Sequence, residues 1–423
     1  GSAAAGSVTG SAAAEELAAE LAANTAPEDS AVDACIAEAR RCPRCNCSAC
    51  IDACTLIRHF KQNPKRIAAD LGVTVLPVDE KIKHVASRML NSCNICGLCT
   101  AVCPAGVDTC LAMYESRRIL LRGGHLPAAY HSFWMDDMAF SMSEEAFAVV
   151  LPVPSALPVL SVGSESAGEK GETGRGLLFF PGCQLTASRP DTVSRTYEHI
   201  KTIAPNASML LSCCGVPADW AGEEAIFEST SEKLRAAWEG LGRPEILYAC
   251  STCKKTFEKA SPMVRGSLVY EWIAENGGGA ARLPGDDARL PGGAMRACVY
   301  DPCSSRADKA GQAAVRELAT RGGFVLDELG PSGETAACCG FGGHIYPANP
   351  TLLGEILAER TAASEVPYIT YCANCNDLFL SEGKDSRHIL DILFPSPSEE
   401  GLPSLTQRRE NRRALKAKYA GLK

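Results

Sequence analysis

The sequence predicts a helix-rich N-terminal domain followed by two pseudo-symmetric α/β domains with parallel sheets. Three observations support this prediction: a cysteine pattern that occurs twice, short apolar segments that alternate with amphipathic ones in both copies, and two earlier cysteine clusters separated by a helical stretch. At 423 residues the chain has room for two or three domains. We therefore expect an α plus α/β architecture.

The cysteine content is the unusual feature of the composition. With 46% hydrophobic and 22% charged residues, the chain otherwise has the composition of an ordinary globular protein, yet it contains 22 cysteines. Disulfide scaffolds are short secreted proteins, and the N-terminal residues lack the pattern of a signal peptide. Clustered Cys-x-x-Cys spacings instead indicate metal or iron–sulfur ligands in a reducing cytosol.

Charge and hydropathy restrict the partners. A net charge of -8 argues against nucleic acid as a partner. The most apolar run, 146–162, contains Pro152, Pro154 and Pro158, so it would form a poor transmembrane helix. We expect a cytoplasmic protein that at most lies peripherally on the inner face of the membrane or docks onto a membrane subunit.

Segments of biased composition divide the chain. Residues 1–30 are rich in Gly, Ser and Ala and are expected to be flexible, whereas 146–176 and 277–293 are expected to be linkers because they are rich in Gly, Pro and polar residues. The domains are then expected at 31–145, 177–276 and 294–398. The tail, 399–423, is basic, and we interpret it as a solvated helix or as a docking arm for an acidic subunit or an anionic membrane surface.

The second cysteine cluster of the N-terminal domain matches a known ligand pattern. Its spacing fits the C-x2-C-x2-C-x3-C-P run of cubane 4Fe-4S ferredoxins at every position. In such a run the first three cysteines bind one cubane and the fourth binds the other. We therefore expect one cluster on Cys93, Cys96, Cys99 and Cys54, and we expect Cys103 to bind the second. The long stretch between the two motifs, in which 80–90 have helical spacing, favours a helical ferredoxin domain over a compact β-type one, and a further helix is expected at 114–121.

The first cysteine cluster departs from the pattern. Counting back from Cys54 gives Cys50 and Cys47, but the next expected position is Arg44. Five cysteines compete for four places. We favour a set of Cys45, Cys47 and Cys50 over a set that uses Cys42. A zinc site is the alternative for this motif.

Ten of the remaining cysteines form an internal repeat in the order C, CC-G, C-x-x-C. The first copy consists of Cys183, Cys213, Cys214, Cys250 and Cys253, and the second of Cys303, Cys338, Cys339, Cys372 and Cys375. Each element follows a short apolar segment that we predict to be a strand: 177–180, 208–211, 246–248, 297–300, 324–327 and 368–371. We predict helices at 191–203, with Asp191 as a candidate cap, and at 223–238. Since ligand sites of parallel sheets lie at the carboxyl ends of strands, five thiols should converge in each copy.

The number and order of these thiols point to an unusual metal site. Five soft thiolates exceed the four that a cubane or a tetrahedral zinc needs. Adjacent cysteines point in different directions from the backbone, so they suit neighbouring irons of an irregular cluster. The glycine after each pair, Gly215 or Gly340, permits the positive φ that a tight ligand loop requires.

Over about residues 35–395 these motifs resemble the CCG-domain family of heterodisulfide reductases, and the ferredoxin domain in front makes the whole similar to their fused catalytic subunit. The resemblance implies that each five-cysteine set binds a noncubane 4Fe-4S cluster and that the two clusters together cleave a disulfide. However, 29 residues separate Cys183 from Cys213, whereas 34 separate Cys303 from Cys338. Of the two sites, the first is therefore the one expected to depart from the family pattern, and zinc is an alternative occupant of it.

Two functional hypotheses follow. In the first, the protein is a disulfide reductase or thiol-oxidising subunit of an anaerobe, in which two cubanes pass single electrons to paired noncubane clusters. In the second, it is an electron-transfer subunit of a flavin-dependent dehydrogenase or electron-bifurcating complex that passes electrons towards quinone, because similar domains occur in such dehydrogenases. No convincing G-x-G-x-x-G fingerprint is present. A flavoprotein subunit is therefore the expected partner, and a membrane quinone-reactive subunit is a further candidate.

Several residues outside the cysteine motifs have both a functional and a structural interpretation. His344 is a candidate proton donor to a leaving thiolate or a loop histidine without a role. Lys254 and Lys255 either bind an anionic substrate group or form a solvated first turn of a helix. Three further cysteines are interpreted as buried packing thiols: Cys35, Cys110 and Cys298.

Overall fold

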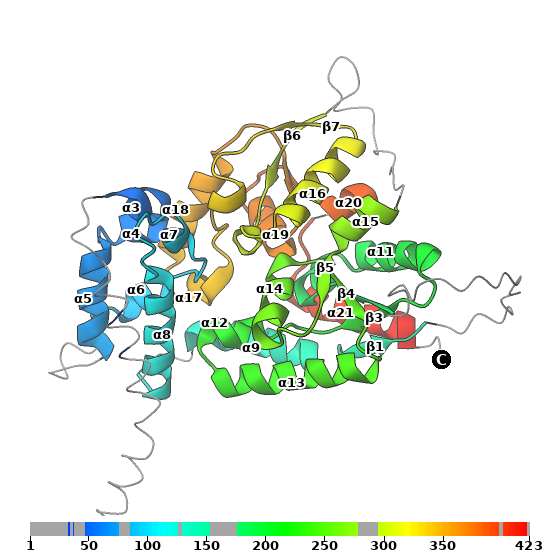
Figure 1. The fold of residues 1–423 in the computed structure, drawn as a ribbon, viewed down its shortest axis with the longest axis horizontal. Coiled ribbons are helices and arrows are strands. Elements are labelled where there is room, and N and C mark those ends of the chain that lie inside the picture. Colours follow the sequence, from blue (N-terminus) through cyan, green and yellow to red (C-terminus); the bar gives the residue numbers. More distant parts are fainter. Residues whose placement is uncertain are drawn as a thin grey trace, which may run out of the picture.

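The computed structural model describes residues 33, 37, 47–75, 85–125, 129–152, 176–277, 295–396 and 401–420. A helical N-terminal part is followed by two α/β parts with mainly parallel sheets (Figure 1). The predicted fold class is therefore confirmed. Among the described residues, no helix is both long and apolar enough to cross a membrane.

The N-terminal part consists mostly of short helices around the cysteine loops. Helix α8 contains the predicted helical segment 114–121, and Asp108 caps its start by accepting a hydrogen bond of 2.9 Å from the backbone N–H of Leu111. Residues 80–84 of the other expected helical stretch lie outside the described residues. The helices of this part are α3 (Ala49–Ala53), α4 (Thr55–His59), α5 (Pro64–Val75), α6 (Ser87–Asn91), α7 (Leu98–Ala101), α8 (Thr109–Arg122) and α9 (Ala129–Met142).

The first sheet has the strand order β1-β3-β2-β4-β5. Strands β2 to β5 are parallel, whereas β1 pairs with β3 antiparallel. Strand β1 lies within 146–176, which was expected to be a linker, so this part of the expectation is wrong: Ala148 to Val150 cover the free edge of β3. The elements are β1 (Ala148–Val150), β2 (Leu177–Phe180), α10 (Cys183–Ser188), α11 (Pro190–Ile203), β3 (Ser208–Leu211), α12 (Val216–Ala221), α13 (Glu224–Gly240), β4 (Glu245–Tyr248), α14 (Ser251–Ala260), β5 (Gly266–Leu268) and α15 (Val269–Asn276).

The second sheet, β7-β6-β8-β9, is parallel throughout. Its order matches that of β3-β2-β4-β5, so the cysteine repeat is accompanied by a repeat of topology. The elements are β6 (Met295–Tyr300), η2 (Cys303–Ser305), α16 (Lys309–Arg321), β7 (Phe324–Asp327), η3 (Gly333–Thr335), η4 (Gly342–His344), α17 (Ile345–Ala348), α18 (Pro350–Thr361), β8 (Tyr368–Thr370), α19 (Ala373–Ser381), β9 (Ser386–His388) and α20 (Ile389–Leu393).

One predicted helix cap is wrong. Helix α11 begins at Pro190 and its N-cap is Arg189, so Asp191 lies inside the first turn. Proline is favoured at the first helical position, because its missing N–H would be unpaired there in any case. The proline therefore sets the start of this helix one residue before the expected one.

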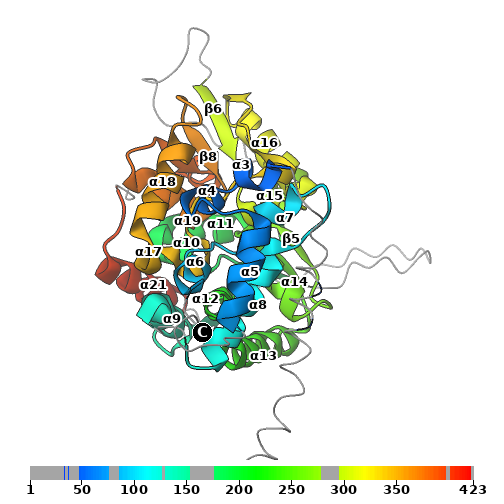
Figure 2. The same ribbon diagram turned by 90° about the vertical axis from the view of Figure 1, so that its left-hand side faces the viewer.

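The packing joins all three parts. One hydrophobic core contains residues of both sheets, such as Leu178 and Val299. A second core contains residues of the N-terminal helices, such as Leu90, together with Tyr300 and Leu352 of the second α/β part. Helix α18 packs on α4, and α17 packs on α6 (Figures 1 and 2). The N-terminal part thus packs extensively on the second α/β part, from which it is distant in sequence.

The basic tail is not a solvated arm. Helix α21 (Leu405–Ala420) packs on α10, α11 and β1 and buries Leu415 and Tyr419. The Arg412 side chain is 3% exposed and bonds both carboxylate oxygens of Asp137 at 2.6 and 2.9 Å. The expectation of a solvated helix is therefore wrong for the face that carries Arg412, Leu415 and Tyr419, whereas docking through the tail stays a prediction.

Candidate functional site

The thiols of the first copy lie together at the carboxyl ends of β2, β3 and β4. Cys183 begins α10, and its sulfur lies 3.4 Å from the sulfur of Cys213. The thiol of Cys214 lies close to those of Cys213 and Cys253, and the thiol of Cys253 lies close to that of Cys250. All five side chains of this first thiol set are thus brought together, as the spacing predicts.

The thiols of the second copy converge in the same way after β6, β7 and β8. The sulfurs of Cys375 and Cys339 lie 3.1 Å apart. The thiol of Cys338 lies close to those of Cys303 and Cys339, and the thiol of Cys372 lies close to that of Cys375. These five residues form the second thiol set.

The two sets touch each other. The thiols of Cys250 and Cys372 lie close enough to interact, which joins the two sets directly. On its other side, the second set contacts the N-terminal part, because the thiol of Cys338 interacts with that of Cys96. An unbroken series of thiols therefore extends from the second N-terminal motif through the second set to the first.

The N-terminal motifs are brought together by α3 and α7, which pack against each other. Burial raises the pKa of Cys54 to about 12, and the proximity of Cys96 and Cys93 adds to this effect. Cys99 lies near the same three thiols. Cys47 and Cys50 lie at the N-terminal end of α3, whereas Cys42 and Cys45 lie outside the described residues.

The glycine after each cysteine pair has the backbone conformation expected of it. Gly215 has φ +89° and Gly340 has φ +105°, which are disfavoured for other residues. The backbone N–H of Gly340 lies 3.4 Å from the sulfur of Cys338. Such N–H donors to ligand sulfurs are typical of iron–sulfur sites, where they influence the reduction potential.

The chemistry of the donor sets fits iron–sulfur clusters better than a single ion. Within the described ranges, no three His, Cys, Asp or Glu side chains are arranged to hold a metal ion. Instead the sulfurs contact one another, and each set has five soft thiols, one more than tetrahedral zinc uses. Soft thiolates select Cu(I), Zn and iron–sulfur clusters, so the fifth thiol of each set is what favours a cluster.

Two arginines without a carboxylate partner among the described residues flank the thiols. Arg117 is fully buried and donates to the carbonyls of Leu90, Cys93, Trp220 and Gly343. A buried guanidinium is costly without an anion. Thiolates near Arg117 would supply the negative charge that its burial requires.

The second of these arginines lies at the junction between Cys96 and Cys338. Arg306 donates to the carbonyls of Cys96 and Ala336, the latter at 2.8 Å. Although burial opposes its charge, nearby thiols, Cys96 foremost and then Cys303, raise its pKa. Arg306 therefore places a positive charge between Cys96 and the second thiol set.

His344 lies in a buried pair of histidines. Its Nδ1 is 3.0 Å from Nδ1 of His131, and Nε2 of both rings has no hydrogen-bond partner. Burial lowers the pKa of His344 well below its usual value, helped by His131 and Arg117. His344 is therefore neutral near pH 7, so it would pass a proton through the pair and would not act as an imidazolium.

Of the two lysines after Cys253, one already has a carboxylate partner. Lys254 forms an ion pair with Asp308 at 2.5 Å and lies 4.0 Å from Glu271. The hypothesis that Lys254 binds an anionic substrate is therefore not supported by its surroundings. Lys255 is exposed.

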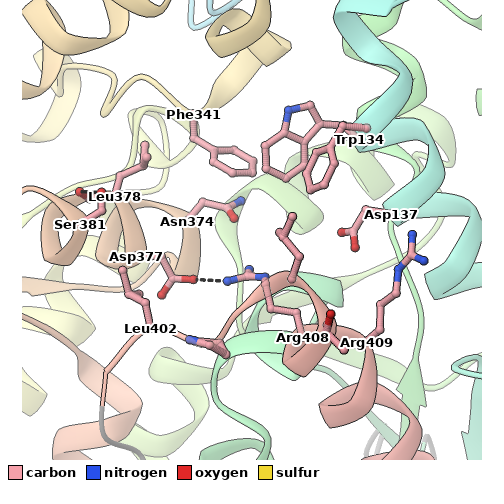
Figure 3. A pocket seen from close by; sticks show the side chains of 14 residues that line it. Trp134, Asp137, Phe341, Asn374, Asp377, Leu378, Ser381, Leu402, Arg408 and Arg409 are labelled. Carbon is pink, nitrogen blue, oxygen red and sulfur yellow. Dashed lines mark hydrogen bonds and ion pairs between the residues drawn. The ribbon is translucent and has the colours of Figure 1, made fainter.

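Three cavities surround the thiol sets. A small one of ≈ 40 Å³ lies on the first set, and a groove of ≈ 720 Å³ extends along the second set and Cys96. A third, of ≈ 470 Å³, lies between α9, α19 and α21 (Figure 3). Phe341 and Asn374 line all three, so the cavities meet at these two side chains.

Several residues of this region were not predicted from the sequence. Cys110, interpreted as a packing thiol, lies near Cys93, Cys96 and Cys99. Arg117, Arg306 and His131 are isolated residues without a motif, and only their tertiary contacts bring them to the thiols. Asn374 could have been noticed, since it stands between Cys372 and Cys375.

Comparison with known families supports the assignment of the two cysteine-rich regions. Residues 41–108 match the family described as 4Fe-4S dicluster domain, and residues 177–258 match the CCG family, described as cysteine-rich domain. The predicted combination of a ferredoxin-type domain and a CCG domain is thereby confirmed.

Three curated proteins are similar over most of the chain. A fumarate reductase (CoM/CoB) subunit from Methanothermobacter marburgensis is 24% identical over 377 residues, which cover 82% of this chain and 70% of that protein. The corresponding dihydromethanophenazine:CoB–CoM heterodisulfide reductase subunits of two Methanosarcina species are each 22% identical. In Methanosarcina mazei the match covers 78% of this chain and 81% of the relative, and in Methanosarcina barkeri 70% and 73%.

Proposed function

We propose that this heterodisulfide-reductase-like iron–sulfur protein belongs to an oxidoreductase complex. In this complex a disulfide would be reduced, or two thiols would be oxidised, between the two thiol sets. The observation that carries the proposal is the contact of Cys250 with Cys372, which joins the two sets. A flavoprotein subunit would supply or accept the electrons.

The bound groups follow the ligand sets predicted above. Two cubane 4Fe-4S clusters would use the N-terminal cysteines and two noncubane clusters the first and second thiol sets, with zinc as the alternative in the first. When bound, these groups supply single-electron transfer and, where the two sets meet, the two-electron cleavage of a disulfide. The contact of Cys96 with Cys338 supports entry of electrons at the second set.

The reaction also requires protons, since RSSR′ plus two electrons and two protons gives RSH and R′SH. His344 lines the cavity on the first set and contacts His131. In two neutral imidazoles joined through Nδ1, one Nε2 carries a proton and the other accepts one. The pair can therefore pass a proton towards a thiolate without becoming charged.

Cys339→Ser tests the proposal, because serine is a harder, poorly deprotonated ligand. In the holoprotein, disulfide reduction should fall by orders of magnitude while dithionite still reduces the cubanes. The matched control is Cys298→Ser, at a buried cysteine outside both sets that lies 3.4 Å from Ser364 Oγ. It should retain full activity. Undiminished disulfide turnover in Cys339→Ser would overturn the catalytic assignment.

A relay without disulfide chemistry is the second candidate. Its support is that the names of the relatives combine CoM and CoB with two different reactants, fumarate and dihydromethanophenazine. EPR of the reduced and thiol-treated protein discriminates the two functions. A thiol-dependent paramagnetic signal is expected of the reductase only, whereas a relay would pass electrons from a flavoprotein to a menaquinone analogue and ignore every disulfide.

A further inference from the structure

The cavity between α9, α19 and α21 has the features of a ligand pocket. Its walls are mainly apolar and aromatic, and its volume of ≈ 470 Å³ suits a small organic group. Figure 3 shows Phe341 and Trp134 on one side and Leu378 and Leu402 on another. Because Phe341 and Asn374 also line the cavities on both thiol sets, the pocket leads to the place where the sets meet.

Two buried oxygens of this pocket have no hydrogen-bond partner, Oδ1 of Asp377 and Oδ1 of Asn374, but the Asp377 oxygen lies 3.6 Å from the guanidinium of Arg189. The carboxylates of Asp137 and Asp377 are already paired, with Arg412 and Arg408 respectively. By contrast, Oδ1 of Asn374 is buried and has no hydrogen-bond partner. Buried polar atoms are nearly always hydrogen-bonded in proteins. A ligand that donates an N–H to this oxygen would satisfy it.

The position of Asn374 restricts where that donor lies in the ligand. Asn374 stands between Cys372 and Cys375 of the second thiol set, and in Figure 3 it projects from α19 towards the centre of the pocket. The donor must therefore lie close to the reacting sulfur of the ligand. N-acyl derivatives of cysteine or cysteamine have an N–H close to the sulfur, whereas simple mercapto acids have no N–H there.

The mouth of the pocket is cationic. Arg409 is exposed there, lies over the ring of Phe140, and has no carboxylate partner among the described residues. An anionic group at the outer end of a ligand would be attracted to this guanidinium. The apolar walls between this mouth and Asn374 would contact the acyl part of the ligand.

We propose that this pocket binds one arm of the sulfur substrate, and that this arm is an N-acylated cysteine- or cysteamine-type thiol with an anionic end. The inference rests on the proposed function and names its substrate class. The N–H would bond to Asn374, the acyl group would lie between Trp134 and Leu378, and the anion would lie near Arg409.

Binding of a matched pair of disulfides to the oxidised holoprotein tests the inference. N,N′-diacetylcystine and 3,3′-dithiodipropionate have the same disulfide and carboxylates and differ in the acetamido group. The wild type should bind the first at least tenfold more tightly by calorimetry. In Asn374→Leu the preference should disappear, while an unchanged visible spectrum would show that the clusters are intact. Equal binding of the two probes by the wild type would overturn the inference.

A second variant guards against disturbance of the clusters by the change at Asn374. Ser381→Trp at the mouth of the pocket should weaken binding of N,N′-diacetylcystine at least tenfold. Its control, Ser231→Trp, lies on α13 at a different surface hollow and should bind as the wild type does. Unchanged binding in Ser381→Trp would overturn the pocket. If the wild type binds and discriminates the probes without reducing either, the proposed reaction fails and the binding site stands.

Discussion

The first and second thiol sets are built on the same strand order, but their surroundings differ. The first set lies beside a cavity of ≈ 40 Å³ that is also lined by Trp134 and Trp220. The second lies along a groove of ≈ 720 Å³ and contacts Cys96 and Arg306. A duplicated scaffold thus presents one enclosed and one open group of five thiols.

The difference arises from what packs on the strand ends. Helix α21 packs on α10, which begins at Cys183, whereas the ferredoxin-type helices pack on the second α/β part. The Gly342-Gly343 loop allows this second contact, since a Cβ on Gly343 would lie 2.1 Å from the carbonyl oxygen of Cys93. Duplication therefore supplied two similar thiol sets, and the added helices gave them different surroundings.

The largest expected effect concerns the order of electron entry. If electrons enter at the second set, Cys339→Ser should slow reduction of the first set by orders of magnitude. Cys214→Ser should leave reduction of the second set within about twofold of the wild type. Rapid-freeze EPR with reduced ferredoxin as the donor measures both. Reduction of the first set at the normal rate in Cys339→Ser would show that electrons do not pass through the second set.

A smaller effect is expected at the first set when α21 is altered. Arg412→Ala removes the buried guanidinium that pairs with Asp137, whose side chain is 13% exposed, and the bond of 3.0 Å from Nε to the carbonyl of Cys183. Loss of one partner of a buried ion pair costs about 3–5 kcal/mol. We expect the iron of the first set to be lost while the N-terminal clusters remain.

The control for this change lies one residue further along α21. Arg413 pairs with Glu145 at the surface, where both side chains are about half exposed. Exposed pairs contribute roughly 0–1 kcal/mol, so Arg413→Ala should retain all its iron. Equal iron content in the two variants would mean that α21 does not support the first set.

The sequence predicted the local elements of this fold well because they depend on nearby residues. The strand at 208–211 is followed at once by Cys213, so apolar pattern and cysteine position together located one edge of the sheet. The basic tail was misjudged because its composition is polar, whereas Arg412 has its partner Asp137 on a distant helix. Burial of a charged residue depends on that partner, which no local pattern contains.

The same limit applies to the candidate site. Spacing brought the ten cysteines of the repeat to two strand edges, but nothing in it indicated that Cys96 contacts Cys338 or that Cys250 contacts Cys372. These contacts depend on how the three parts pack. Arg306 could not be predicted from a motif for the same reason, because its effect depends on where the fold places its charge.

Arg306 offers a way to sharpen the comparison through reduction potentials. Removing a positive charge near Cys96 and Cys338 favours the oxidised, less negative state, so Arg306→Gln should lower the potentials of the second set and the adjacent cubane. The interaction of a partly buried guanidinium with the charge of a nearby cluster contributes roughly 1–2 kcal/mol. This energy corresponds to a shift of roughly 40–90 mV in a one-electron reduction potential. EPR-monitored redox titration measures this. Arg118→Gln, which breaks pairs with Glu115 and Glu224, should leave these potentials unchanged.

The smallest effect concerns the histidine pair beside the first set. Burial, followed by the nearby Arg117, lowers the pKa of His131 to about 3. In the unfolded chain a histidine titrates near 6.5, so between about pH 3 and 6.5 the unfolded state binds more protons. The free energy of unfolding therefore decreases as the pH falls below 6.5, by about 1.4 kcal/mol at pH 5.5 for this residue.

His131→Asn retains a polar partner for His344 but does not titrate in this range. The drop in melting temperature between pH 7.5 and 5.5 should therefore be smaller in this variant than in the wild type, under anaerobic conditions that keep the clusters intact. The matched control is His125→Asn, because His125 is exposed at the end of α8, and it should show the wild-type drop. An acid drop in His131→Asn as large as that of the wild type would mean that the pair is already charged. The enclosed first set would then have a cationic neighbour, as the second set has in Arg306, and the electrostatic difference between the two sets would disappear.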